Sequence, residues 1–200
     1  MLRLLWLVIG YGIGNVQSAY IVGRIMKVDL RQHGSGNLGT TNALRVLGKR
    51  AGIATFVFDI LKSVIAFVIC YKIFKDPLSG VYASFGAVLG HDFPCYLNFK
   101  GGKGVAATIG LIMCLSVVYN PYFAIITFGL GITGVILSNM VSVGSLLFMV
   151  AIPIMCFALK VPVEITGVTV AMSVLALFKH KENLIRLKNG NENKLVKKKS

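Results

Sequence analysis

Apolar residues gather in seven long runs that short polar segments separate. A membrane-spanning helix needs about 20 apolar residues, with a range of roughly 17–25. Inside lipid such a run must be helical, because a helix satisfies its own backbone groups. The pattern predicts an all-α integral membrane protein with about seven transmembrane helices, at Leu4–Gly23, Gly52–Tyr71, Leu78–Phe93, Gly104–Val118, Tyr122–Leu137, Val141–Leu159 and Val163–Phe178. The third and fifth runs are short and could be tilted or re-entrant, so six spans are the alternative.

The composition favours lipid as the solvent for these runs. Hydrophobic residues make up 56% of the 200 residues, against about 45–50% in soluble domains. Charged residues make up only 14%, against roughly 25%. One small soluble core cannot bury that apolar excess.

The first run could instead be a signal peptide, since Arg3 gives it a small basic start. Gln17-Ser18-Ala19 is a poor cleavage site, however, and the run is long for a signal sequence. We therefore predict an uncleaved span.

The basic residues indicate which ends of the runs face the cytoplasm. With the N-terminus outside, the cytoplasmic segments are 24–51, 94–103, 138–140 and 179–200, and they hold sixteen Lys and Arg residues against four on the other side. Such a bias is typical of cytoplasmic loops. The net charge of +14 is thus explained by the membrane, and nucleic acid is not expected as a partner.

This topology also predicts the domain organisation. Residues 1–178 would form a single polytopic transmembrane domain with cytoplasmic loops at 24–51 and 94–103, where the motifs of the two loops predict an active site. Residues 179–200 would form a cytoplasmic C-terminal segment with a basic tail. The three histidines, His33, His91 and His180, would all lie at the cytoplasmic face.

The first polar segment with candidate chemistry is Gly34–Arg45, which reads GSGNLGTTNALR. Glycine lets backbone N–H groups approach an anion closely, and hydroxyl side chains add donors. Arg45 can donate two hydrogen bonds to one phosphate group. No acidic residue occurs between Leu30 and Ala54, which favours an anion site over a plain flexible turn.

The second polar segment contains Gly90-His91-Asp92-Phe93-Pro94, followed by the run Phe99–Gly104 with sequence FKGGKG. A glycine turn that leads into a helix predicts an anion site, because the helix N-terminus offers unpaired N–H groups and partial positive charge. The spacing is not that of a nucleotide-binding P-loop. Ordinary lysines beside the membrane are the alternative.

The third polar segment follows the last run and reads KHKENLIRL from Lys179 to Leu187, with Gly190 and Glu192 beyond it. His180 and Asn183 are three residues apart and would share one face of a helix. By itself this segment is weak evidence, since a surface histidine is the more common explanation. The last lysines are typical of a tail near anionic lipid.

Two other patterns are explained by helix packing. Gly129, Gly131 and Gly134 match a dinucleotide-binding spacing, but they lie inside an apolar run. Small residues that let helices approach closely explain them, and they explain Gly10, Gly12 and Gly14 in the same way.

Polar residues inside the runs allow fewer conclusions. Asp59 and Lys62 are three residues apart within the second run, so they could pair with each other or line a polar path. The four cysteines form no C-x-x-C pair, and we expect packed, reduced thiols rather than a disulfide or metal site.

Together, the three polar segments resemble the motifs of the bacterial membrane glycerol-3-phosphate acyltransferases that use acyl phosphate. Gly34–Arg45 is similar to the family's S-G-N-x-G-x-T-N-x-x-R pattern. Gly90–Gly104 is similar to its G-H-x-x-P and F-K-G-G-K-G run. The third segment is similar to R-H-x-x-N-I-x-R-L, with Lys179 and Leu184 in place of Arg and Ile.

The resemblance implies a reaction, which is the transfer of a fatty acyl group from acyl phosphate to the C1 hydroxyl of glycerol 3-phosphate. The products would be lysophosphatidic acid and phosphate. It also implies a bacterial inner-membrane location, no metal and no organic cofactor. The expected partners are the two substrates and membrane lipid, with the soluble enzyme that makes acyl phosphate as a further candidate.

The motifs predict which residues form the site. Catalytic roles are predicted for Ser35, Arg45, Lys103, His180 and Asn183. Binding of the substrate phosphates is predicted for Gly36, Asn37, Gly39, Thr40, Thr41, Asn42, His91, Lys100, Gly101, Gly102 and Gly104. Arg186 and Glu192 are predicted to support the site.

Two different groups could accept the proton of the glycerol hydroxyl in this reaction. No H-x-x-x-x-D motif and no G-x-S-x-G elbow is present, so we expect no covalent intermediate. The donor's own phosphate could take the hydroxyl proton, or His180 could act as general base.

Two other classes of function compete with an enzyme. A transporter of a phosphorylated metabolite would suit Asp59 and Lys62, but the chain shows no internal repeat. A structural or assembly role would not explain the dense anion-binding motifs.

Overall fold

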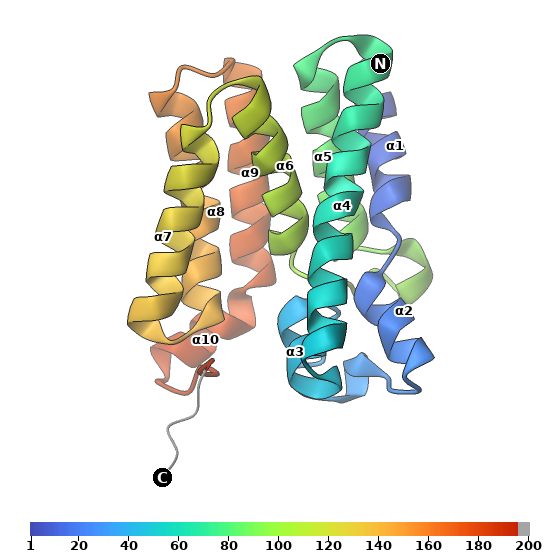
Figure 1. Ribbon diagram of the computed structural model, residues 1–200, viewed down its shortest axis with the longest axis vertical. Helices are drawn as coiled ribbons and strands as arrows, with labels where there is room; N and C mark the ends of the chain where they lie inside the picture. The colour runs from blue at the N-terminus through green and yellow to red at the C-terminus, as the bar shows by residue number, and fades with distance from the viewer. Residues whose placement is uncertain (196–200) are drawn as a thin grey trace. The chain divides into compact units, whose positions relative to one another are not determined.

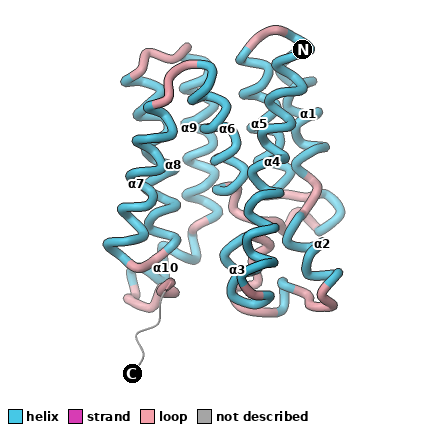
Figure 2. Tube along the Cα trace, viewed as in Figure 1, coloured by secondary structure: helices cyan, strands magenta, loops and turns pink. Residues whose placement is uncertain are grey.

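The computed structural model describes residues 1–195, and those residues contain helices and loops but no strand (Figure 1, Figure 2). The α-helices are α1 (Leu2–Gly14), α2 (Ser18–Ile25), α3 (Thr40–Leu47), α4 (Lys49–Phe74), α5 (Pro77–Asp92), α6 (Val105–Val118), α7 (Tyr122–Ser138), α8 (Val141–Ala158), α9 (Val163–Lys179) and α10 (Lys181–Lys188). Two short 3₁₀ helices are η1 (Leu30–Gln32) and η2 (Cys95–Leu97).

Six of the seven predicted runs are single helices whose ends lie within a few residues of the prediction. The largest extension is at α4, which has 26 residues. At 1.5 Å per residue, that length corresponds to about 39 Å, which exceeds the hydrocarbon core of a bilayer, about 30 Å thick.

The first run, predicted as one helix, is broken in the structure. α1 ends at Gly14 and α2 begins at Ser18. At the break, the side-chain amide of Asn15 donates to the carbonyl of Tyr11 at 2.8 Å. Asparagine side chains that bond nearby backbone compete with helix continuation, and Gln17 then takes an extended conformation.

Several helices are long and apolar enough to cross a membrane. Among residues 1–195, three segments meet this test, namely Leu2–Ile25 across its break, Lys49–Phe74 and Val141–Ala158. Val163–Lys179 and Lys181–Lys188 meet it as a pair bent by 58°. Val105–Val118 and Tyr122–Ser138 are shorter apolar helices.

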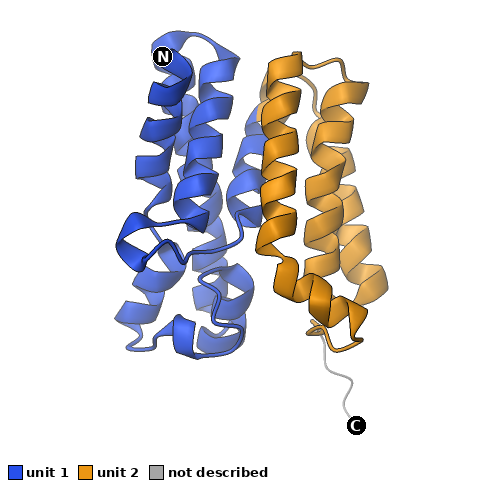
Figure 3. Cartoon of the chain, turned by 180° about the vertical axis from the view of Figure 1, so that it is seen from behind, with its two compact units in different colours: residues 1–114 blue, residues 115–200 orange. Residues whose placement is uncertain are grey.

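The chain divides into two compact units, residues 1–114 and residues 115 onward (Figure 3). In the first unit α5 packs against α1 and α4, and α3 packs against α4. In the second unit α8 packs against α7 and α9. Large apolar side chains such as Leu137 and Phe157 are each 82% exposed, as expected for surfaces that face lipid.

Glycines bring α1 and α5 into close backbone contact. A Cβ atom at Gly10 would overlap the carbonyl of Ala83, and one at Gly14 would overlap that of Ala87. On the α5 side of the contact, a Cβ at Gly86 would overlap the carbonyl of Leu7 in α1. Both helices therefore need glycine, as small-residue interfaces in membranes do.

Two glycines do not serve the packing role predicted for them. A Cβ at Gly12 or at Gly129 would meet nothing within 4 Å. Both positions are exposed, so their helices turn these glycines away from their neighbours. Gly131 and Gly134, in contrast, do pack against α8 beside Gly144.

This difference predicts opposite effects of alanine on stability. Gly86→Ala should destabilise the fold by about 1–3 kcal/mol, because the added methyl overpacks a tight contact. Gly12→Ala should be neutral or stabilise by up to about 1 kcal/mol, because alanine favours helix. Thermal unfolding of both variants in detergent measures this, and equal midpoints would contradict the packing of α1 on α5.

Candidate functional site

The Gly34–Arg45 segment forms a glycine loop that leads directly into α3. Gly34 and Gly36 have φ angles of +63° and +70°, in the left-handed region that glycine adopts most readily. Gly39 is the N-cap of α3 and has no side chain to cap the helix. The first N–H groups of α3 therefore lack a side-chain acceptor from the cap residue, and a helix start of this kind attracts anions.

Asn42 shapes this loop from within α3. Its side-chain oxygen accepts the Ser35 N–H at 2.9 Å. Its side-chain nitrogen donates to the carbonyls of Leu30 at 3.1 Å and His33 at 3.0 Å. Since Asn42 is 1% exposed, its amide holds the loop, and its direct contact with phosphate stays a prediction.

Three other polar side chains of this segment form no hydrogen bond that holds the loop within residues 1–195. Ser35 and Arg45 are exposed, and Arg45 has no hydrogen-bond or ion-pair partner among residues 1–195. Thr40 Oγ1, at the start of α3, is buried and has no hydrogen-bond partner in the same described part of the chain. A hydroxyl, a helix start and a guanidinium thus lie within one short segment.

The neighbouring Arg31 differs from Arg45 in that its guanidinium is paired with a carboxylate. Its guanidinium binds the Asp29 carboxylate at 2.7–3.2 Å and lies 5.5 Å from the ring centroid of Tyr20. The hydrogen bonds from Arg31 lower the pKa of Asp29 to about 2. Asp29 therefore offsets the charge of Arg31, whereas no carboxylate within residues 1–195 is paired with Arg45.

The second glycine segment folds back onto the end of α5. The Gly102 N–H donates to the carbonyl of His91 at 3.0 Å, and the Gly101 N–H donates to that of Asp92 at 3.2 Å. These bonds satisfy carbonyls that a helix C-terminus leaves unpaired. The N–H groups of Gly101 and Gly102 thus fix the loop, and contact of these glycines with phosphate stays a prediction.

The same segment ends at the start of α6, as the sequence predicted. Gly104 has a φ angle of +71°, and its carbonyl accepts from both the N–H and the hydroxyl of Thr108, at 2.8 and 2.9 Å. A Cβ at Gly104 would overlap a methyl of Val88. Lys103, half-buried, and the exposed Lys100 flank the glycines.

The two glycine segments share one hydrophobic cluster. Leu38 and Ala43 of the first segment pack with Leu97, which precedes Lys100 by three residues, and with Ala19 and Leu30. All five side chains are at most 6% exposed. The structure therefore brings together two segments that are about sixty residues apart in the sequence.

The third segment belongs to the second unit. His180 lies at the junction of α9 and α10, where its Nδ1 is 2.8 Å from the carbonyl of Ala176. The Asn183 amide donates to Glu192 at 2.8 Å, and Arg186 donates to the same carboxylate at 2.9 Å. His180, Asn183 and Glu192 are each at most 8% exposed, and the contacts of Glu192 fit a supporting role.

Sequence reasoning missed the residues that anchor the second segment to the break between α1 and α2. The buried Gln17 side chain donates to the carbonyls of Gly90 and His91, at 3.2 and 3.0 Å. Asn15 accepts the N–H of Cys95 at 3.0 Å, and the Tyr11 hydroxyl donates to Phe93 at 2.7 Å. Polar side chains in the middle of an apolar run were the available signal.

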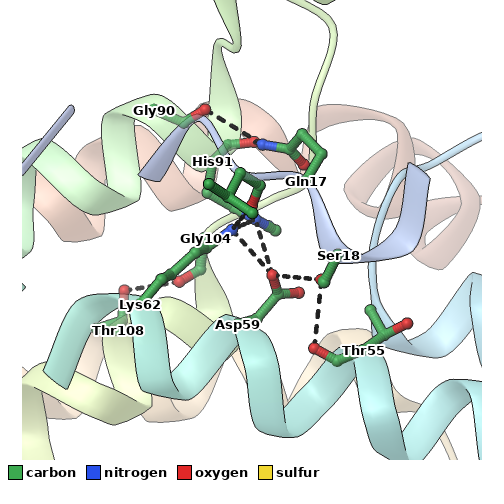
Figure 4. Close-up of polar contacts among 10 residues, drawn as sticks. Gln17, Ser18, Thr55, Asp59, Lys62, Gly90, His91, Gly104 and Thr108 are labelled. Carbon is green, nitrogen blue, oxygen red and sulfur yellow. Dashed lines mark hydrogen bonds and ion pairs between the residues drawn. The ribbon is translucent and has the colours of Figure 1, made fainter. Parts of the chain in front are cut away.

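His91, predicted to bind phosphate, is 3% exposed and lies against Asp59 and Lys62 of α4 (Figure 4). Its contact with phosphate stays a prediction. Asp59 and Lys62 pair at 2.9 Å, which confirms the simpler of the two explanations considered for them.

A helical chain embedded in the membrane, with two glycine loops that each precede a helix start, has the features of an enzyme that acts on phosphorylated substrates. A family model described as glycerol-3-phosphate acyltransferase matches residues 4–190. Glycerol-3-phosphate acyltransferases of Alkaliphilus metalliredigens and Halalkalibacterium halodurans are 38% and 40% identical over 201 residues, and the matches cover 100% and 96% of both chains. The chain belongs to the glycerol-3-phosphate acyltransferase family.

Solved structures agree with this membership. The fold is similar to the crystal structure of PlsY (YgiH), an integral membrane glycerol 3-phosphate acyltransferase, in its glycerol 3-phosphate form. The TM-score is 0.89 at 31% identity, and the match covers 97% of this chain and 96% of that one. The lysophosphatidic acid form gives 0.86 at 30% identity, with 96% and 94% covered. The predicted family is confirmed, the protein is a multi-pass membrane acyltransferase, and the acyl donor stays a prediction.

Proposed function

We propose that this protein transfers a fatty acyl group from acyl phosphate to the C1 hydroxyl of glycerol 3-phosphate, giving lysophosphatidic acid and phosphate. The observation that carries the proposal is the pairing of two glycine loops in one compact unit, each followed by a helix start. Two such loops fit a reaction in which two phosphate groups lie side by side.

Electrostatics explains the composition of the loops. Acyl phosphate and glycerol 3-phosphate together carry roughly three to four negative charges at pH 7. Their repulsion has to be offset by cations and N–H donors. Arg45, Lys100 and Lys103 supply the cations, and no carboxylate in the described part of the chain is paired with Arg45.

We assign the residues of the site as follows. Ser35, Thr40 and Arg45 bind one phosphate group, with the backbone of Gly36, Asn37, Gly39 and Thr41 around it. Lys100, Lys103 and Gly104 bind the adjacent one. For His180 and Asn183 we propose the catalytic roles that their motif predicts, and Arg186 and Glu192 hold Asn183 in place, because the carboxylate of Glu192 accepts from both Asn183 and Arg186.

The chemical step needs little help with the leaving group. The glycerol hydroxyl oxygen attacks the acyl carbonyl carbon, and the bond from that carbon to the phosphate oxygen breaks. The hydroxyl proton passes to the departing phosphate, so that no protein group changes its charge. Positioning and charge stabilisation then supply most of the rate enhancement.

His180 is the alternative proton acceptor, and its geometry defines how it would act. A carbonyl 2.8 Å from Nδ1 favours a proton on Nδ1, which places the lone pair of the neutral ring on Nε2. As general base, His180 would therefore accept the proton at Nε2.

The pH dependence of kcat/KM separates the two routes. The second ionisation of the substrate phosphates, near pH 6, gives a limb in which activity rises with pH. We expect this limb to persist in His180→Gln, although the overall rate falls. Loss of the limb in that variant, measured with saturating donor in detergent, would assign the proton to His180.

We also propose the topology that the charges predict. The protein would lie in the bacterial inner membrane with about seven spans, the N-terminus outside and the site at the cytoplasmic face. The acyl chain of the donor would lie between helices, and soluble glycerol 3-phosphate would enter from the cytoplasm. The soluble enzyme that makes acyl phosphate is then a candidate partner.

A donor comparison tests the proposal. Purified protein is given glycerol 3-phosphate with acyl phosphate, acyl-CoA or acyl carrier protein loaded with the same acyl group, in parallel. We expect lysophosphatidic acid and one equivalent of phosphate with acyl phosphate alone. Product from acyl-CoA at a comparable rate would contradict the donor assignment, and no product from acyl phosphate would contradict the proposed reaction.

A further inference from the structure

A buried ionisable cluster in the first unit has no part in the proposed chemistry. Asp59 and Lys62 of α4 and His91 of α5 are 1%, 5% and 3% exposed. The Lys62 ammonium lies 2.9 Å from Asp59 Oδ1 and 2.7 Å from His91 Nδ1 (Figure 4). Ionisable groups inside a membrane protein are costly, and they are candidates for function.

The contacts of Lys62 define the protonation of the cluster. An ammonium group has three N–H donors, and three acceptors surround this one, namely Asp59 Oδ1, His91 Nδ1 and the Val16 carbonyl at 3.3 Å. Asp59 Oδ1 also accepts from the Ser18 hydroxyl at 2.8 Å. With Lys62 as an ammonium, His91 Nδ1 is the acceptor, and the neutral ring carries its proton on Nε2. Nδ1 also lies 3.4 Å from Asp59 Oδ1, so a proton on Nδ1 would instead be donated to that carboxylate.

The other side of the imidazole faces the second glycine loop. A Cβ atom at Gly102 would overlap Nε2 of His91, so Gly102 packs directly on the ring. The carbonyl of His91 accepts the Gly102 N–H at 3.0 Å. Lys103 is the next residue, so the position of the ring sets the position of a cation of the proposed site.

We propose that Asp59, Lys62 and His91 form a positioning network that fixes the Lys103 loop and so sets the affinity for a phosphate substrate, not the rate of the chemical step. The proposal rests on the assignment of Lys103 to the site. A buried ion pair is weak evidence for a stabilising role, because a packed apolar pair of similar volume is often as stable. Here the pair orients a histidine against a loop.

The test compares the double variant Asp59→Asn/Lys62→Met with Lys103→Gln and the unaltered protein. The double variant removes both charges together, which avoids an unpaired buried carboxylate. We expect its KM for one of the two substrates to rise roughly tenfold, as misplacement of a binding group would cause, with kcat within about threefold. Lys103→Gln should raise the KM for the same substrate.

Two outcomes separate the inference from the site assignment. A folded double variant with unchanged KM, alongside a defective Lys103→Gln, overturns the positioning network alone. An unchanged KM in Lys103→Gln overturns the role of the loop itself. Folding is checked by the thermal midpoint in detergent.

A second measurement leaves the network unaltered. It therefore tests the proposal even if the double variant does not fold. The full chain is labelled with ¹⁵N-histidine, and the signal of His91 is assigned by comparison with His33→Gln and His180→Gln. We expect a neutral ring at pH 7 with the lone pair on Nδ1 and the proton on Nε2. A proton on Nδ1, whether in the other tautomer or in an imidazolium, would overturn the hydrogen bond from Lys62 to His91 on which the proposed network depends.

Discussion

Replacement of Arg45 with alanine is expected to lower kcat/KM by about 100- to 1,000-fold, the range seen when one donor to a developing negative charge is removed. Arg45 is exposed at the last turn of α3 and has no partner among the described residues. Its removal should therefore leave the fold intact. Steady-state rates with acyl phosphate and glycerol 3-phosphate, together with a thermal midpoint, measure both effects.

Arg24→Ala is the matched control for this prediction. It removes the same kind of side chain from the exposed end of α2, outside the glycine loops. We expect its kcat/KM to stay within about threefold of the original, because surface charges contribute little on their own. Full activity in Arg45→Ala would show that the site is misplaced.

Gly102→Ala is expected to lower kcat/KM by roughly 100-fold, the loss that a displacement of about 1 Å in a catalytic group can cause. The added Cβ atom would overlap the buried imidazole of His91. The loop would have to move away, and Lys103 would move with it. Rates measured as a function of each substrate would show which of the two phosphates the loop binds.

Gly129→Ala provides the comparison at a glycine with open space around it, since its Cβ would meet nothing within 4 Å. It should keep full activity and stability. If Gly102→Ala also kept full activity, the tight packing of the loop on His91 would have no catalytic consequence.

The helical fold was predictable because lipid imposes a simple rule on apolar runs. Six of the seven runs were correct because their ends lie at or near glycine, proline, asparagine or charged residues. The break between α1 and α2 was missed because Asn15 and Gln17 read as ordinary polar residues in an apolar run. Only the fold shows that their side chains bind α5 and the loop after it.

For the candidate site, the loops and the helix starts were predictable, whereas the hydrogen bonds of their individual groups were not. Glycine with nearby cations identified both loops. The sequence could not show that Gly101, Gly102 and Asn42 form hydrogen bonds within the protein. Such bonds depend on which carbonyls lie nearby, and that is a property of packing. His91 was recognised by its motif, but its burial against Lys62 depends on the distant helix α4.

Whether all three polar segments face the cytoplasm and bind the same ligand can be measured directly by cysteine labelling. Cys95 is exposed and the other three cysteines are buried, so Cys95 reports on the second segment. His33→Cys and Lys181→Cys, each combined with Cys95→Ser, report on the other two.

A membrane-impermeant maleimide is then applied to inside-out and right-side-out vesicles, with and without glycerol 3-phosphate. We predict that all three positions react only in inside-out vesicles, and that glycerol 3-phosphate slows the reaction at both 33 and 181. Labelling from opposite faces, or slowing at only one of those two positions, would contradict a single shared site.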